Sequence, residues 1–185
     1  PNGAEVFEAE DGGGKLELPA GAKTEIVIWT TTPWTIPGNT GIALAEAAQY
    51  VLIRAGWHGQ DRYFVVAYAL MDVLVDECGL QDATVVGRAQ GRALEGLVAV
   101  HPLYGRDSRI VLADYVVMDQ GTGCVHTAPG HGLEDFQTAL KYDLGVVSPL
   151  DDFGKFTAEA GSELEGKVCD RSNDLVIEML TAKGA

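Results

Sequence analysis

Residues 121–136 read Gly-Thr-Gly-Cys-Val-His-Thr-Ala-Pro-Gly-His-Gly-Leu-Glu-Asp-Phe, and they concentrate chemically versatile side chains between residues that bend the backbone. These sixteen residues include four glycines, one proline, two histidines, a cysteine and two acidic residues. The pattern predicts a turn at 121–123, a short strand over 124–128, a loop over 129–132 and a helix over 133–142. We therefore expect His126 at a strand end and Asp135 in the first turn of a helix, where an acidic side chain suits the helix dipole.

On either side of this stretch, the chain alternates short runs of β-branched and aromatic residues with turn signals. Strands are predicted over residues 25–30, 41–45, 50–54, 62–66, 83–86, 96–100, 109–118 and 145–149, and helices over 67–78, 133–142 and 172–183. Many short strands with three helices indicate a β-rich α+β fold, with the strands closed into a barrel and the helices outside it.

Length and composition favour one compact domain. The chain has 185 residues, of which 46% are hydrophobic, and no apolar run approaches the length of a membrane-spanning helix. The acidic, glycine-rich segment over residues 1–23 is expected to be a flexible lead-in. It has no basic region of the kind that begins a signal peptide, and no initiator methionine, so we expect a piece of a longer polypeptide.

Two segments of the sequence carry a family resemblance. Residues 121–135 resemble the editing-site segment of isoleucyl-tRNA synthetase, and residues 29–39, Trp-Thr-Thr-Thr-Pro-Trp-Thr-Ile-Pro-Gly-Asn, resemble the threonine-rich peptide of that family. The related valyl and leucyl editing domains typically have an arginine after the threonine pair and Ala-His-Asp in place of Gly-His-Gly. This chain has neither, which favours the isoleucyl family and its bacterial form.

The resemblance implies a closed barrel of about six strands with peripheral helices, forming a single editing domain over residues 1–185 that is inserted in a larger synthetase. It also implies the site residues. Thr31, Thr32, His126 and Asp135 are expected to be catalytic, with Asp135 binding the substrate ammonium group and His126 helping to limit the side chain admitted. The residues expected to bind substrate are Thr30, Trp34, Thr35, Gly130 and His131.

The implied activity is hydrolysis of misacylated tRNA, namely valyl-tRNA(Ile), and also of valyl-adenylate, with water as the nucleophile and isoleucine excluded by size. The expected partners are the 3′ end of tRNA(Ile) carrying valine, valine itself and the rest of the parent synthetase; no membrane partner and a monomer are expected. The chain lacks His-Ile-Gly-His and Lys-Met-Ser-Lys-Ser motifs, so we expect no synthetic activity and no cofactor.

The sequence also allows other roles for these residues. Cys124, His126 and His131 could bind zinc with Glu134 or Asp135, but the Cys-x-His spacing is not that of a structural zinc site, and no metal is expected. A Cys-His nucleophilic pair lacks an orienting third group. Alternatively, the threonines and histidines could be structural, in a binding module that docks the tRNA acceptor end without catalysis.

Charge and cysteine content bear on partners and compartment. Three well-separated cysteines argue against a disulfide framework and fit a reducing cytoplasm. The formal net charge of −14, from 13 basic and 27 acidic residues, leaves no basic stripe for a nucleic-acid backbone. Contact with tRNA is therefore expected only at its terminal nucleotides, and binding by this chain alone should be weak.

Overall fold

The computed structural model describes residues 6–7, 16–17 and 23–185. These residues form two compact units, one from residues up to 29, 42–97 and 110–125, and the other from residues 30–41, 98–109 and 126–185. The predicted lead-in over residues 1–23 lies outside the described residues except for Lys23 and the two-residue strands β1 (Val6–Phe7) and β2 (Leu16–Glu17).

The first unit is built on a four-stranded sheet with the order β3-β6-β5-β7. Its strands are β3 (Thr24–Ile26), β5 (Gln49–Trp57), β6 (Gln60–Ala67) and β7 (Gln81–Gln90). β5 pairs antiparallel with both β6 and β7, whereas β3 pairs parallel with β6. The consecutive residues 50–53 of β5 are all fully buried, which is the pattern of a central strand covered on both faces.

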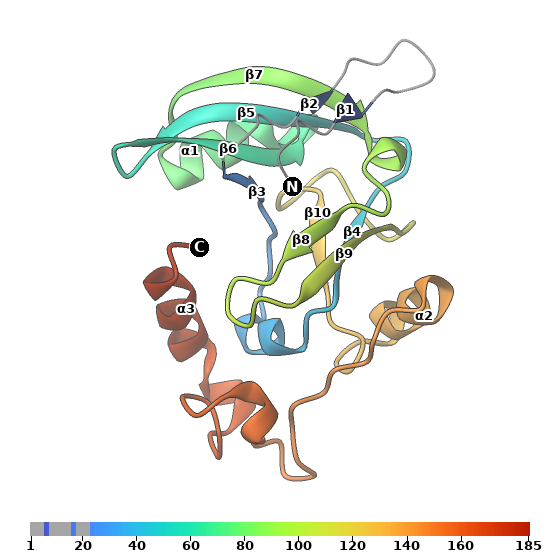
Figure 1. Ribbon diagram of the computed structural model, residues 1–185, viewed down its shortest axis with the longest axis vertical. Helices are drawn as coiled ribbons and strands as arrows, with labels where there is room; N and C mark the ends of the chain where they lie inside the picture. The colour runs from blue at the N-terminus through green and yellow to red at the C-terminus, as the bar shows by residue number, and fades with distance from the viewer. Residues whose placement is uncertain (1–5, 8–15, 18–22) are drawn as a thin grey trace. The chain divides into compact units, whose positions relative to one another are not determined.

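One helix accompanies this sheet. The short helix η2 (Tyr68–Leu70) leads into α1 (Met71–Cys78), which lies along the sheet in Figure 1. Gly79 ends α1 in the left-handed conformation, with φ of 61°, as expected for a glycine that follows the last helical residue. The helix predicted over residues 67–78 is thus confirmed in its end, whereas its start differs: Ala67 belongs to β6 and the α-helix begins at Met71.

A second four-stranded sheet has the order β10-β4-β9-β8. Its strands are β4 (Gly41–Leu44), β8 (Val98–Val100), β9 (Asp107–Leu112) and β10 (Cys124–Thr127). The division between the two units falls within β4, β9 and β10. In the first unit, the helix η3 (Gly91–Ala93) follows β7.

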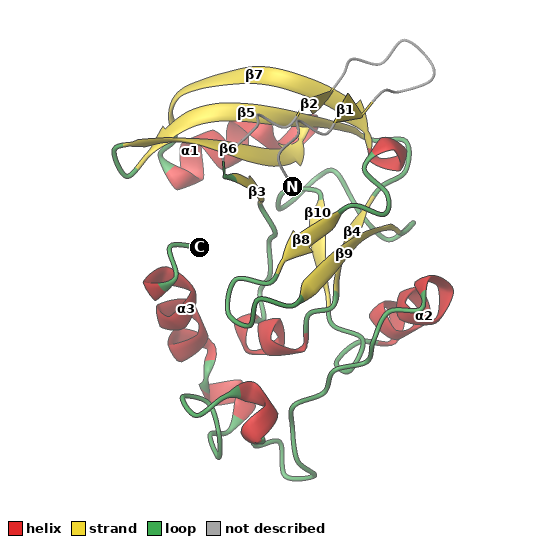
Figure 2. Ribbon diagram, in the orientation of Figure 1, coloured by secondary structure: helices red, strands yellow, loops and turns green. Residues whose placement is uncertain are grey.

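The second unit contains the remaining helices, and Figure 2 shows a long loop that leads from α2 towards the C-terminal helices. They are η1 (Pro33–Gly38), α2 (Leu133–Tyr142), η4 (Ala158–Ala160), η5 (Cys169–Arg171) and α3 (Asn173–Ala182). α2 has the predicted bounds, and α3 lies within the predicted range 172–183. Leu164 and Val176 are fully buried and belong to the core of this unit. None of the helices in the described part of the chain is long and apolar enough to cross a membrane.

The prediction of a closed barrel of about six strands is wrong. Within the described residues, β3 and β7 are the edge strands of one sheet and β10 and β8 are those of the other, so neither sheet closes. The described residues form an α+β fold with two open four-stranded sheets, in addition to the two-stranded antiparallel pair β1-β2. The number of strand-forming runs does not determine which strands pair, because pairing depends on contacts between distant parts of the chain.

Three of the predicted strands also fail in whole or in part. The strand predicted over residues 25–30 ends at Ile26, and beyond it Trp29 forms only an isolated bridge. The apolar run over residues 109–118 is a strand only as far as Leu112, since a turn follows at Asp114 and Tyr115. Aspartate is disfavoured in strands. Residues 145–149 form no strand ladder, and the nearest pairing is an isolated bridge between Leu150 and Phe156.

Candidate functional site

All the predicted site residues lie in the second unit, so their mutual geometry can be described. They come from three segments: the threonine segment with the following helix η1, the end of β10 with the loop after it, and the first turn of α2. The residues are Thr30, Thr31, Thr32, Trp34, Thr35, His126, Gly130, His131 and Asp135.

The threonine segment, residues 30–32, is folded by its own side chains. The Thr32 backbone N–H donates to the Thr30 hydroxyl at 3.0 Å, and the Thr31 and Thr32 hydroxyl oxygens are 3.4 Å apart. Thr31 is exposed, whereas Thr30 and Thr32 are half-buried. Pro33 then occupies the first turn of η1, where the absence of an N–H has little cost. The Thr31 and Thr32 hydroxyls can therefore offer hydrogen bonds to a ligand.

His126 is buried, with 8% of its surface exposed, and both of its ring nitrogens are engaged. Nε2 lies 2.9 Å from the Thr35 hydroxyl, and Nδ1 lies 3.1 Å from the side-chain nitrogen of Asn39. Burial, assisted by the imidazoles of His101 and His131, lowers the pKa of His126 to about 4. The ring is therefore neutral at pH 7, and its nitrogens serve to hold η1 to β10.

Asn39 is a site residue that the sequence did not reveal. It is 7% exposed, and its side-chain nitrogen donates to the Gly41 carbonyl at 2.8 Å in addition to facing His126. Its side-chain oxygen accepts a 2.6 Å hydrogen bond from Ser108, which is also buried. The only local signal was an asparagine directly after Pro-Gly, which is equally typical of an ordinary turn.

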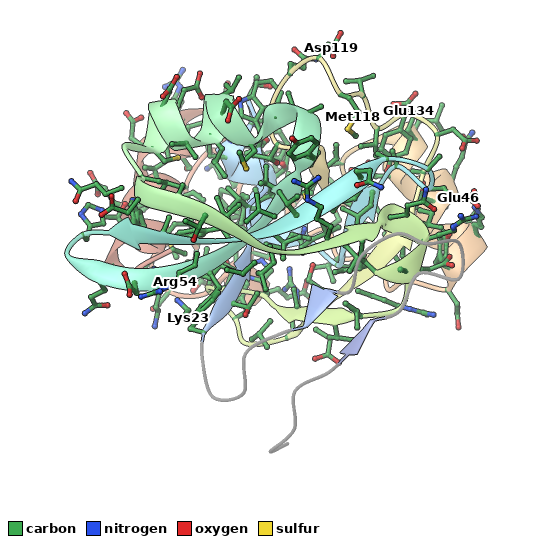
Figure 3. The ribbon with its side chains drawn as sticks, turned by 90° about the horizontal axis from the view of Figure 1, so that it is seen from above. Lys23, Glu46, Arg54, Met118, Asp119 and Glu134 are labelled. Atoms are coloured by element: carbon green, nitrogen blue, oxygen red, sulfur yellow. The ribbon has the colours of Figure 1, made fainter. Side chains whose placement is uncertain are left out.

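Asp135 connects α2 to the end of β10. Its Oδ2 accepts a 2.8 Å hydrogen bond from the backbone N–H of Ala128, two residues beyond His126. A Cβ on Gly132 would lie 3.5 Å from the Asp135 carboxyl carbon, which is an ordinary van der Waals contact, so this approach does not require glycine at position 132. Asp135 is half-buried. Its neighbour Glu134, which is labelled in Figure 3, is exposed. Only one of the two acidic residues in this turn is thus fixed to the strand.

Trp34 and His131 pack together beside η1. Their ring centroids are 5.1 Å apart in an edge-to-face arrangement, and the Trp34 backbone N–H donates to the side chain of Asn173 at the start of α3 at 3.0 Å. Burial lowers the pKa of His131, which Asp135 partly opposes. Nε2 of His131 is buried and has no hydrogen-bond partner among the described residues.

Glycines at two positions allow this packing. A Cβ on Gly38 would lie 2.7 Å from the His131 ring, and one on Gly130 would lie 2.7 Å from the Val147 carbonyl oxygen. Both distances are shorter than real Cβ contacts. Gly130 therefore lies where the backbone approaches residues 147–148 closely, which gives it a packing role within this unit.

The segment between β8 and β9 holds the carbonyl groups of η1, a feature absent from the sequence prediction. His101 is 2% exposed; its Nε2 donates to the Ile36 carbonyl at 2.9 Å, and its Nδ1 accepts from the Leu103 N–H at 3.1 Å. Arg106 donates to the Asn39 carbonyl at 2.8 and 3.0 Å and also to the Pro37 carbonyl. The Ile36 carbonyl, which also accepts from the Asn39 N–H, and the Pro37 and Asn39 carbonyls are thus bound at the end of this helix by the segment between β8 and β9.

The alternatives involving cysteine and metal find no geometric support. The described residues contain no group of three or more histidine, cysteine or acidic side chains arranged to hold a metal ion. Cys124 is 1% exposed, and its burial raises the pKa of its thiol. A neutral, buried thiol is a poor nucleophile.

Comparisons with known proteins agree with one another. Residues 10–173 match the family model described as leucyl-tRNA synthetase, editing domain. Isoleucine--tRNA ligase of Fervidobacterium nodosum is 48% identical over 92% of this chain, and that of Bacillus subtilis is 45% identical over 97%. The chain spans only 18% and 19% of the length of these two relatives.

Solved structures show the same fold at low sequence identity. The crystal structure of GlLeuRS-CP1 matches with a TM-score of 0.67 and 16% identity over 88% of this chain and 82% of that one. The editing domain of P. falciparum cytosolic leucyl-tRNA synthetase matches with a TM-score of 0.60 and 14% identity over 88% and 68% of the two chains. The chain therefore belongs to the family of aminoacyl-tRNA synthetase editing domains and is homologous to a segment of the isoleucine--tRNA ligases.

Proposed function

We propose that this chain is the hydrolytic editing domain of an isoleucyl-tRNA synthetase, which removes valine from valyl-tRNA(Ile) with water as the nucleophile. The observation that carries the proposal is the double attachment at the end of β10. His126 binds the segment of Thr35 and Asn39, while Ala128 binds Asp135. One strand end thus holds in place the hydroxyl-bearing segment and the carboxylate that the reaction requires.

The proposed chemistry assigns the binding of the substrate ammonium group to Asp135. A carboxylate and an ammonium group form a charge-assisted contact, which is stronger than a neutral hydrogen bond in a half-buried setting. The hydroxyls of Thr31 and Thr32 would orient the ester and the attacking water. An ester is reactive enough to be hydrolysed without a covalent nucleophile, so a buried neutral His126 and an inert Cys124 are compatible with the activity.

The need for such a site comes from the size of the amino acids. Valine lacks one methylene of isoleucine, a difference worth about 1–3 kcal/mol in an apolar pocket, and isoleucyl-tRNA synthetase is itself the standard example of this limit. A second site that admits valine and excludes isoleucine supplies the missing discrimination. Trp34, Gly130 and His131 are proposed to form part of its wall. The expected setting is the cytoplasm, within a larger monomeric synthetase that binds tRNA.

The test is deacylation of valyl-tRNA(Ile) compared with isoleucyl-tRNA(Ile), with Asp135→Ala alongside. We expect selective hydrolysis of the valyl ester and a loss of about 10- to 100-fold in the variant, the value of one charge-assisted contact. Glu134→Ala is the matched control, because it removes an adjacent exposed carboxylate and should leave the rate unchanged.

Two other results would count against the proposal. Equal hydrolysis of both esters would remove the size selection. No hydrolysis at any protein concentration, with the acceptor end still bound, would favour a docking module without catalysis. Circular dichroism of each variant is needed, because Asp135→Ala also removes the hydrogen bond to Ala128.

A further inference from the structure

A continuous chain of buried hydrogen bonds runs from β9 through His126 to the threonine segment. It comprises Ser108 to Asn39 at 2.6 Å, Asn39 to His126 at 3.1 Å, His126 to Thr35 at 2.9 Å and Thr35 to the Thr32 carbonyl at 2.8 Å. Ser108, Asn39, Thr35 and His126 are all less than 9% exposed. Each of these four side chains can both donate and accept a hydrogen bond. The direction of each bond is therefore set by the groups at the two ends of the chain of bonds, which can only accept.

The Gly41 carbonyl determines the direction at one end. It can only accept, so the Asn39 atom 2.8 Å from it must be the amide nitrogen. The amide oxygen then faces Ser108, which donates to it. The second hydrogen of the amide nitrogen is directed at Nδ1 of His126, which must therefore carry no proton.

The Thr32 carbonyl determines the direction at the other end. It also can only accept, so the single hydroxyl proton of Thr35 is used there. The Thr35 oxygen can consequently only accept from Nε2 of His126, which must carry the ring proton. The two ends lead independently to the same tautomer. An imidazolium would place an N–H on Nδ1 against the N–H of Asn39, so the charged form cannot complete the chain.

We propose that Asn39 and Ser108 are positioning residues that lock His126 as the neutral imidazole protonated on Nε2. In this state the ring anchors Thr35, and Thr35 in turn anchors the carbonyl of Thr32, one of the residues assigned to the reaction. His126 thereby acts as a structural link of the site and transfers no proton. The consequence for catalysis rests on the proposed editing function, whereas the tautomer itself does not.

The experiment is nitrogen NMR of the histidine side chains, in which protonated and unprotonated ring nitrogens have well-separated shifts. In the unaltered chain we expect Nε2 of His126 protonated and Nδ1 unprotonated throughout the neutral range. Asn39→Asp replaces the donor that faces Nδ1 with an acceptor, so the proton should appear on Nδ1. Valyl-tRNA deacylation should then fall by about tenfold or more, the value of roughly one hydrogen bond.

His101 provides an internal control. It is held in the same tautomer by the Leu103 N–H and the Ile36 carbonyl, with no bond to the Asn39 side chain, so its shifts should not move. Ser108→Ala leaves the side-chain oxygen of Asn39 without its hydrogen-bond donor. The ring-nitrogen shifts of His126 should then move partway towards those in Asn39→Asp. Ser172→Ala removes another buried serine hydroxyl bond, to the Val168 carbonyl, and should leave them unchanged.

The outcomes separate the two proposals. A proton on Nδ1 of His126 in the unaltered chain, or an unchanged tautomer in Asn39→Asp, would overturn the lock whatever the activity. If His126 has the expected tautomer in a chain that hydrolyses neither ester, the tautomer proposal holds and the editing proposal fails. If Asn39→Asp does not fold, the unaltered chain and Ser108→Ala still decide the matter.

Discussion

At the scale of single residues, the second unit buries two neutral histidines whose ring nitrogens are all hydrogen-bonded. His126 and His101 are 8% and 2% exposed, and burial lowers the pKa of each to about 4. His126 is hydrogen-bonded to Thr35 of η1 and to Asn39 directly after it, and His101 is hydrogen-bonded to the Ile36 carbonyl of η1. A histidine near a polar site is commonly expected to move protons. Here the two imidazoles keep a segment of backbone in place.

The low pKa values of these histidines predict the pH dependence of stability. The unfolded chain takes up protons near pH 6.5, whereas the folded chain does so only near pH 4, so the unfolded state binds more protons between these values. The free energy of unfolding should therefore be highest above pH 6.5 and decrease as the pH falls towards 4, by on the order of 2–3 kcal/mol per histidine. Urea unfolding at a series of pH values measures this.

A matched variant isolates the contribution of one ring in that experiment. His126→Asn cannot take up a proton, so its stability should fall less steeply between pH 6.5 and pH 4 than that of the unaltered chain, although it is lower at neutral pH. Equal slopes for the two proteins would contradict the pKa argument for His126.

At the scale of elements, close packing of the loop after β10 onto η1 depends on glycine. Gly38 leaves room for the His131 ring and Gly130 for residues 147–148. η1 itself was not predicted, because Pro33 and Pro37 indicate only that a strand must end. A short 3-10 helix with proline in its first turn satisfies the same constraints. Its position is then determined by Arg106, His101 and Asn173.

Gly38→Ala tests this packing. The added methyl group would lie 2.7–2.8 Å from two atoms of the His131 ring, which is itself packed against Trp34. We expect a decrease of about 1–3 kcal/mol in the free energy of unfolding, typical of overpacking, and a loss of deacylation. Gly145→Ala is the control, since nothing lies within 4 Å of a Cβ there and its φ is not positive. Similar losses in both variants would refute the packing role of Gly38.

At the scale of the whole molecule, the charge bears on how the chain can meet tRNA. The formal net charge is −14, with 13 basic residues in 185. Three of these are already in salt bridges: Arg54 with Asp61, and Lys23 and Arg62 with Glu25. Proteins that follow a nucleic-acid backbone need many free cations. An acidic domain that makes up about a fifth of the length of its relatives can leave this task to other parts of such a protein.

We therefore predict weak binding of tRNA by this chain, with a shallower salt dependence than that of proteins that contact many phosphates. The dissociation constant should exceed about 10⁻⁴ M near physiological salt, and the logarithm of the binding constant should change with that of the salt concentration with a slope shallower than about −2. A short acceptor-stem hairpin is the control, because contact confined to the terminal nucleotides predicts equal affinity for hairpin and full tRNA. Tenfold tighter binding of the full tRNA would show that the domain contacts its body.

The sequence alone determined the family, the helices α1, α2 and α3, most of the strands, and the placement of His126 at a strand end and Asp135 in a first helical turn. These features depend on residues that are near neighbours in the chain: a glycine after α1, an acidic first turn, an alternation of apolar runs and turns. The segments that resemble the family lie within single short stretches as well.

How the strands pair could be learned only from the tertiary structure, which has two open four-stranded sheets in place of the expected barrel. It also brought Ser108 and His126 to Asn39, which lies 69 and 87 residues away from them in sequence. The tautomer proposed for His126 follows from its contacts with Asn39 and Thr35 and from the Gly41 and Thr32 carbonyls that orient these two side chains. Propensity and spacing cannot supply such information, because a hydrogen-bond partner is specified by where the chain returns in space and not by which residues stand beside it.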